Sequence, residues 1–166
     1  TLNGTAITAG QDLTIRSVDS LTFGTVGAGR NVSLSSSNGG LIVTTDLDAG
    51  GTATLSADFI AVSAVGALRV NSASADNGNI SIVTDGLLRV DSASALGDIT
   101  LTSTADSLIV GGAVAGDAPQ DDLALTAETT TGSGAIGSGA ITLAAANDIT
   151  LLATVDAATS LAATAG

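Results

Sequence analysis

Two segments of this chain, twenty residues apart, are nearly identical. Residues 68–75 read Leu-Arg-Val-Asn-Ser-Ala-Ser-Ala, and residues 88–95 repeat them with a single difference, Asn71 against Asp91. A period near 20 residues is typical of solenoids, in which each repeat forms one coil and buries its apolar face only against its neighbours. The repeat therefore favours a stack of coils over a compact globule.

A shorter pattern runs through the whole chain: an aliphatic residue, then Ser or Thr, then a second aliphatic residue. The first residues of successive copies lie 19, 21, 27, 19, 24, 18 and 8 positions apart, so most intervals match one coil. We expect the longer intervals to contain inserted loops, and the interval of 8 to reach the next face of the same coil. The copies are Leu13-Thr14-Ile15, Val32-Ser33-Leu34, Ala53-Thr54-Leu55, Ile80-Ser81-Ile82, Ile99-Thr100-Leu101, the imperfect Leu123-Ala124-Leu125, Ile141-Thr142-Leu143 and Ile149-Thr150-Leu151.

Alternating segments between these copies predict further strands. Because neighbouring residues on a strand point to opposite faces, Val32 and Leu34 should enter the core while Ser33 faces solvent. Dense β-branched residues and frequent glycines argue against helices. The further strands are expected at Leu21-Thr22-Phe23, Leu41-Ile42-Val43, Ile60-Ala61-Val62, Leu88-Arg89-Val90 and Leu108-Ile109-Val110.

These patterns predict an all-β fold, a parallel β-helix (β-solenoid) with coils of about 20 residues and two or three short strands in each coil. We expect residues 1–166 to form one solenoid segment, part of a longer repetitive chain or fibre. The composition fits a narrow lumen filled by small aliphatic side chains, since the chain is 45% apolar but has only two Phe and no Trp or Tyr.

The composition also restricts function. The chain has no His, Cys, Tyr or Lys, so most general bases and activated nucleophiles are missing. A carboxylate pair could still support glycoside hydrolysis, which leaves a carbohydrate-active β-helix enzyme as an alternative to the non-catalytic protein that we expect. The net charge of −12 argues against nucleic acid and anionic membranes as partners. No apolar run is long enough for a membrane-spanning helix.

Two segments carry a resemblance to a known family. Residues 97–103, Gly-Asp-Ile-Thr-Leu-Thr-Ser, and residues 146–151, Ala-Asn-Asp-Ile-Thr-Leu, resemble the repeats of filamentous-haemagglutinin-type (two-partner-secreted) bacterial exoproteins. The resemblance covers nearly the whole chain. It implies a right-handed parallel β-helix shaft that bacteria secrete through a partner outer-membrane transporter and display at the cell surface as an adhesin or fibre.

The hydroxyl residue at the centre of each short pattern is the first candidate site. If the copies stack, these residues form an outward column similar to the hydroxyl arrays of ice-binding β-solenoids. We expect instead that they serve the solvent face of the strands, because the spacing is irregular and each strand offers one hydroxyl. The column would contain Thr14, Ser33, Thr54, Ser81, Thr100, Thr142 and Thr150.

Acidic residues form the second candidate site. Asp46 with Asp48, and Asp117 with Asp121 and Asp122, supply oxygen ligands that calcium accepts. The Gly-Gly-x-Gly-x-Asp repeat of calcium-binding β-rolls is missing, so we expect solvated turn aspartates, no resident cofactor and at most weak calcium binding.

Two arginines form the third candidate site. Arg69 and Arg89 should stack on adjacent coils about 5 Å apart, with Asp85 and Asp91 near enough to offset their charges. Exposed charges on a solenoid face are usually just solvated, which is what we expect here.

Residues 111–122 and 129–134 break the pattern, and we expect them to loop out of the coils. Neither end of the chain shows a capping sequence, which suggests covalent continuation or end-to-end stacking of identical subunits. The function that the sequence favours is the structural shaft of an extracellular fibre or adhesin at a bacterial cell surface. Its partners would be neighbouring repeats or subunits, with a host-cell, matrix or polysaccharide ligand. A self-assembling fibre subunit and an ice- or surface-binding solenoid remain alternatives.

Overall fold

The computed structural model of the chain describes residues 1–111, 113–115, 122–132, 136–151 and 155–165, and it describes side chains up to residue 111 and at residues 162–164. These residues form strands and no helix, as the sequence predicts. The strands are β1 (Leu2–Ala9), β2 (Leu13–Ser17), β3 (Leu21–Ala28), β4 (Val32–Ser36), β5 (Leu41–Ala49), β6 (Ala53–Ala57), β7 (Ile60–Ala64), β8 (Leu68–Ala75), β9 (Ile80–Thr84), β10 (Leu88–Val90), β11 (Ala93–Ala95), β12 (Ile99–Ser103), β13 (Ser107–Val110), β14 (Ala113–Ala115), β15 (Asp122–Gly132), β16 (Ile136–Leu151) and β17 (Val155–Ala165).

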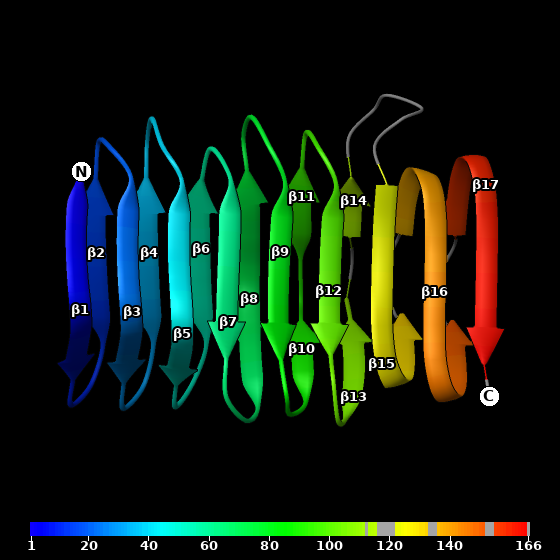
Figure 1. The fold of residues 1–166 in the computed structure, drawn as a ribbon, viewed down its shortest axis with the longest axis horizontal. Coiled ribbons are helices and arrows are strands. Elements are labelled where there is room, and N and C mark those ends of the chain that lie inside the picture. Colours follow the sequence, from blue (N-terminus) through cyan, green and yellow to red (C-terminus); the bar gives the residue numbers. More distant parts are fainter. Residues whose placement is uncertain (112, 116–121, 133–135, 152–154, 166) are drawn as a thin grey trace.

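The strands wind into a parallel solenoid with two facing sheets (Figure 1). The front sheet contains β1, β3, β5, β7, β9 and β12, and the rear sheet contains β2, β4, β6, β8, β10 and β11. Front strands run down and rear strands run up in Figure 1 while the chain advances from left to right, which makes the coil right-handed. We number the coils from the N-terminus: coils 1 to 4 have one front and one rear strand each, and coils 5 and 6 begin at β9 and β12.

The front sheet shows the repeat most regularly. The first residues of its strands pair in series, Leu2 with Leu21, Leu21 with Leu41, and Leu41 with Ile60, and the series continues through Ile80 to Ile99. Each step along this series is 19 or 20 residues. The prediction of coils of about 20 residues with two or three strands each is therefore confirmed.

The lumen holds one continuous apolar core. Thirty residues from Ile15 to Val110 form a single buried cluster, and most are Leu, Ile, Val or Ala. Val32 and Leu34 are almost fully buried while Ser33 between them is partly exposed, as strand alternation predicts. Since each of coils 1 to 6 contributes to this cluster, each of them packs against the coils beside it and is stabilised by them.

The interval of 27 residues was interpreted wrongly. No loop is inserted between Ala53 and Ile80; instead the pattern moves from the rear sheet, where Ala53 starts β6, to the front sheet, where Ile80 starts β9. The interval of 8 was interpreted correctly, because Ile141 pairs with Leu123 while Ile149 pairs with Thr130, farther along β15.

Two further expectations need correction. Of the segment 129–134, residues 129–132 do not loop out: they end β15 and pair with β13 and β16, while residues 133 and 134 lie outside the described part. Within the segment 111–122, residues 113–115 form β14, which pairs with β11, while residues 112 and 116–121 lie outside the described part. The cause is the same in both places, since parallel pairing supplies main-chain partners even to a weakly alternating sequence.

Candidate functional site

The relative lengths of the front and rear strands reverse between coil 3 and coil 4. In coils 1 to 3 the front strand has 8 or 9 residues and the rear strand has 5. In coil 4 the front strand β7 has 5 residues and the rear strand β8 has 8. The lower turn therefore moves from Gly50 and Gly51 in coil 3 to residues 65–67 in coil 4, and we call this change the corner shift.

Glycine occupies the lower turn in both coils, but for two different reasons. A Cβ atom on Gly50 would lie 2.4 Å from the carbonyl oxygen of Gly29 in the coil before, which real Cβ atoms do not tolerate. Gly66 has a different reason: its φ of +83° is a conformation that side chains disfavour. The corner shift thus replaces a turn that needs close approach with a turn that needs a left-handed residue.

Polar side chains tie each corner to the coil before. In the early coils Asn31 donates to Asp12 Oδ1 over 3.1 Å, and its own Oδ1 accepts the Thr52 amide over 3.1 Å. In the later coils Asp46 Oδ1 accepts the Val65 amide over 2.8 Å, and Asp85 accepts the amide of Gly66. Asp85 therefore serves the turn and not Arg69 or Arg89, to which the sequence reasoning had assigned it.

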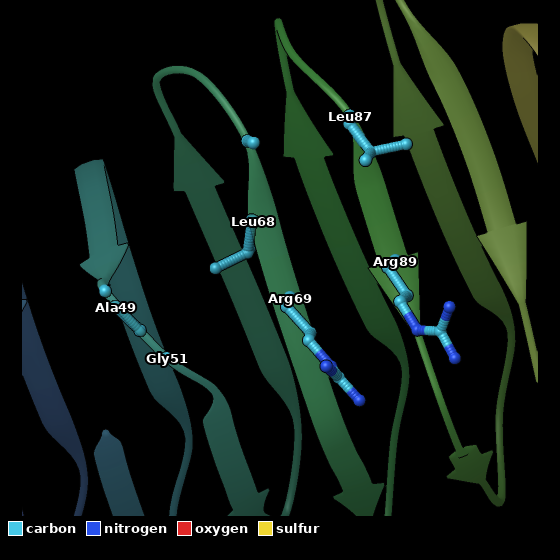
Figure 2. A pocket seen from close by; sticks show the side chains of 8 residues that line it. Ala49, Gly51, Leu68, Arg69, Leu87 and Arg89 are labelled. Carbon is cyan, nitrogen blue, oxygen red and sulfur yellow. The ribbon is translucent and has the colours of Figure 1, made fainter. Parts of the chain in front are cut away.

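The corner shift leaves a hollow on the outside of the solenoid. The pocket has a volume of about 250 Å³ and crosses coils 3, 4 and 5. Figure 2 shows Arg69 and Arg89 extending the same way from neighbouring strands, with Ala49 and Gly51 on the other side. The lining residues are Ala49, Gly50, Gly51, Ala67, Leu68, Arg69, Leu87 and Arg89.

The stacking of the two arginines is confirmed. Arg69 and Arg89 are paired in register between β8 and β10. Asp91 lies between their guanidinium groups: Arg69 donates to its Oδ2 over 3.0 Å and Arg89 Nε donates to its Oδ1 over 2.7 Å. The hydrogen bond from Arg69, together with that from Arg89, holds the pKa of the Asp91 carboxyl below its usual value of 3.8. Asp91 therefore stays ionised and fixes both cations.

The predicted hydroxyl column divides between the two sheets. Thr14, Ser33 and Thr54 pair in series in the rear sheet, whereas Ser81 and Thr100 pair in the front sheet. Backbone pairing places Thr142 beside Ala124 and Thr150 beside Thr131, so neither extends the rear column. The single column was wrong because it assumed that every copy of the pattern lies on one face.

The rear sheet has a more regular array than the sequence suggested. From coil 2 to coil 5 each rear segment presents two outward hydroxyl residues, so two columns run side by side. Neighbouring positions lie about 4.8 Å apart along the solenoid axis and about 6.6 Å apart along a strand. This hydroxyl face consists of Ser33, Ser35, Thr54, Ser56, Ser72, Ser74, Ser92 and Ser94, all exposed or partly exposed.

Of the acidic candidates, only Asp46 and Asp48 have described side chains. Asp46 is engaged with the backbone of Val65, and Asp48 is exposed on β5. Asp117 and Asp121 lie outside the described residues, and only the backbone of Asp122 is described, at the start of β15. Among the described residues no three His, Cys, Asp or Glu side chains group closely enough to hold a metal ion. Weak calcium binding stays a prediction.

The fold defines the class: this chain is a right-handed parallel β-solenoid. Comparison with protein-family models, with curated proteins and with solved structures found no match. Among the described residues there is no helix with the length and apolar character needed to cross a membrane.

Sequence reasoning missed the corner shift and its pocket. Two signals were present: the Gly50-Gly51 pair, and the 27-residue interval, which was attributed to an inserted loop. The pocket arises only when three coils are superimposed, which the period alone does not give.

Proposed function

We propose that this chain is a structural segment of an extracellular bacterial fibre or adhesin, in which stacked coils supply a stiff shaft. The observation that supports this proposal is the continuity of the stack: parallel pairing runs from β1 through β16 to β17, over one uninterrupted core in the part with described side chains. Such a molecule gains length with every coil and needs no catalytic centre to do its work.

The surface chemistry supports the same proposal. A net charge of −12 and a nearly aromatic-free surface resist non-specific association, as a protein displayed at high density requires. The resemblance of residues 97–103 to exoprotein repeats adds display at a bacterial surface and secretion through a partner transporter to the proposal. A role in adhesion rests on that resemblance.

Electron microscopy of the native material at sub-nanometre resolution tests the shaft. We expect extended density with an axial repeat of about 4.8 Å. Continuous density through successive 166-residue units would indicate a covalent shaft or end-to-end stacking, and denaturing mass analysis of the same material separates these two. Discrete compact particles without an axial repeat would contradict the proposal.

The hydroxyl face supports a second candidate function, binding to an ordered surface such as ice. Binding to an ordered surface requires a regular array of hydroxyl groups. The two columns of the rear sheet supply such an array, whereas a single hydroxyl per strand does not. Thermal hysteresis of the purified chain is the measurement. We expect Ser56→Tyr, at the centre of the face, to abolish any hysteresis, and Ser81→Tyr on the front sheet to leave it unchanged. Hysteresis that is absent, or equal in both variants, would remove this candidate.

A further inference from the structure

The pocket at the corner shift has a chemistry that the rest of the described surface does not share. The chain contains four arginines and no lysine, and two of the four border this one hollow. Arg30, by comparison, is paired with Asp12 over 3.1 Å at a different corner. In an acidic protein the two stacked arginines are the densest positive charge that the described residues offer.

Charge at the pocket is only half neutralised. Two guanidinium groups face the single carboxylate of Asp91, which leaves one positive charge in excess. A guanidinium carries five N–H donors in a planar fork, and the hydrogen bonds to Asp91 use one donor on each arginine. The arginine side chains are 52% and 46% exposed, so their remaining donors can reach a ligand.

The two arginines are also held in position. Their backbones pair in register on adjacent strands, and both side chains are fixed by the same carboxylate. A ligand would therefore meet donors that already point the same way, as Figure 2 shows, and would not have to order two free side chains. Such preorganisation distinguishes this pair from an ordinary solvated arginine.

The rest of the pocket is apolar and small. Ala49, Ala67 and Leu87 line it, and Gly50 and Gly51 bring bare backbone to its wall. A volume of about 250 Å³ lies below the usual range for drug-sized ligands, about 300–1,000 Å³, and suits a ligand of one ring. The planar fork of arginine matches a carboxylate in two-point contact better than it matches a point charge.

We propose that this pocket binds a carboxylate carried on a compact, partly apolar ring, with a sugar acid as the ligand class. Arg69 and Arg89 receive the carboxylate, Asp91 positions both guanidinium groups, and Leu87 with Ala67 contacts the ring face. The site goes beyond the shaft function, because a shaft needs no ligand. Contacts from one ring at the surface predict a dissociation constant in the millimolar range.

Two-dimensional NMR of the ¹⁵N-labelled full chain, titrated with galacturonate, tests the site. We expect saturable shifts of the Arg69 and Arg89 Nε–H signals and of the Gly50 and Gly51 amides. Galactose, which lacks the carboxylate, should give no saturable shift. Galactose 6-sulfate separates carboxylate recognition from general anion attraction, and equal shifts with it would overturn the carboxylate assignment.

Variants complete the test. Arg69→Gln with Arg89→Gln should weaken binding at least about tenfold, as expected for loss of charge-assisted hydrogen bonds. Ala67→Leu, which fills the hollow without changing charge, should weaken it as well, and Arg30→Gln is the matched control that should bind like the native chain. An unchanged amide spectrum outside the pocket verifies folding. Absence of saturable shifts at millimolar galacturonate, or equal loss in Arg30→Gln, would overturn the proposal.

Discussion

Coils 1 to 3 and coils 4 to 6 enclose the same core with different corners. In the early coils the chain stays on the front sheet for 8 or 9 residues and turns at a glycine such as Gly50. In coil 4 it leaves the front sheet after 5 residues, turns at Gly66, and stays on the rear sheet for 8. Leu47 of β5 and Leu68 of β8 are both 1% exposed, although they belong to different sheets.

The difference teaches that core and corners are specified by separate parts of the sequence. The core needs only an apolar residue at each inward position, whichever sheet supplies it. A corner with close backbone approach or a positive φ needs a residue that tolerates it, and in coils 3 and 4 that residue is glycine. A solenoid can therefore move a corner without interrupting its lumen, and the surface hollow is the consequence.

The largest expected effect tests whether the core really is continuous across the corner shift. We expect Leu47→Ala and Leu68→Ala each to lower the free energy of unfolding by about 3 kcal/mol, because each opens a cavity in a buried cluster. Urea denaturation measures the loss. Both variants should still unfold in one transition, and hydrogen exchange should rise together in coils 1 to 6.

A different outcome would break the comparison. If Leu47→Ala exposed coils 1 to 3 to exchange while coils 4 to 6 stayed protected, the corner shift would separate two cooperative units. Val18→Ala is the matched control, since Val18 is 64% exposed and its truncation should change the unfolding free energy little.

The second effect concerns the early corner. Gly50→Ala places a methyl group against the carbonyl oxygen of Gly29, a backbone atom that no side-chain rotation can move away. We expect a loss of about 2 kcal/mol, in the range of other overpacking substitutions. Gly27→Ala, one coil earlier, is the control because its Cβ would meet Thr8 Cγ2 at 3.4 Å and the Asp48 carbonyl oxygen at 4.0 Å, which are ordinary contacts. Equal unfolding free energies for the two variants would show that close approach does not define this corner.

These corners mark the limit of what the sequence could predict. The period followed from the repeated segments, and the strands and their inward residues followed from alternation, since Val32 and Leu34 are buried as expected. The stacking of Arg69 on Arg89 followed from the exact twenty-residue repeat. What could not be predicted was the face to which each copy belongs, because Ile80-Ser81-Ile82 reads the same on either sheet.

The candidate site shows the same limit more sharply. Arginine pairing was predicted and solvation was expected, but the hollow beside the pair depends on Gly50 and Gly51, eighteen or more residues away. A period relates residues one coil apart. It does not say where adjacent coils differ, and a pocket on a regular solenoid forms where they differ.

The third effect concerns the later corner, and it sharpens the contrast with the second. A Cβ atom on Gly66 would lie in open space, so only the φ of +83° opposes a side chain there. Gly66→Ala should cost about 1 kcal/mol, and Gly66→Asn should cost less because asparagine enters the left-handed region more easily. Thermal unfolding of both variants measures the difference. If asparagine were no better than alanine, steric approach and not φ would limit this corner as well.

The smallest expected effect is the pH dependence of the free energy that the polar contacts of the two regions contribute to folding. Because the folded-state pKa of Asp91 is lowered, its ion pairs stabilise the fold above the usual value of 3.8, and this contribution is lost as the pH falls through the lowered folded value. Asp91→Asn should therefore cost a few tenths of a kcal/mol at pH 7, as exposed ion pairs usually do, and almost nothing near pH 2. Asp12, whose pKa is lowered first by the Asn31 amide and also by Arg30, provides the matched substitution in the early coils. Urea titrations at both pH values measure the unfolding free energy of the native chain, of Asp91→Asn and of Asp12→Asn. A cost of Asp91→Asn that stayed constant with pH would mean that Asp91 acts through hydrogen bonding alone, and the excess positive charge assigned to the pocket would then have to be revised.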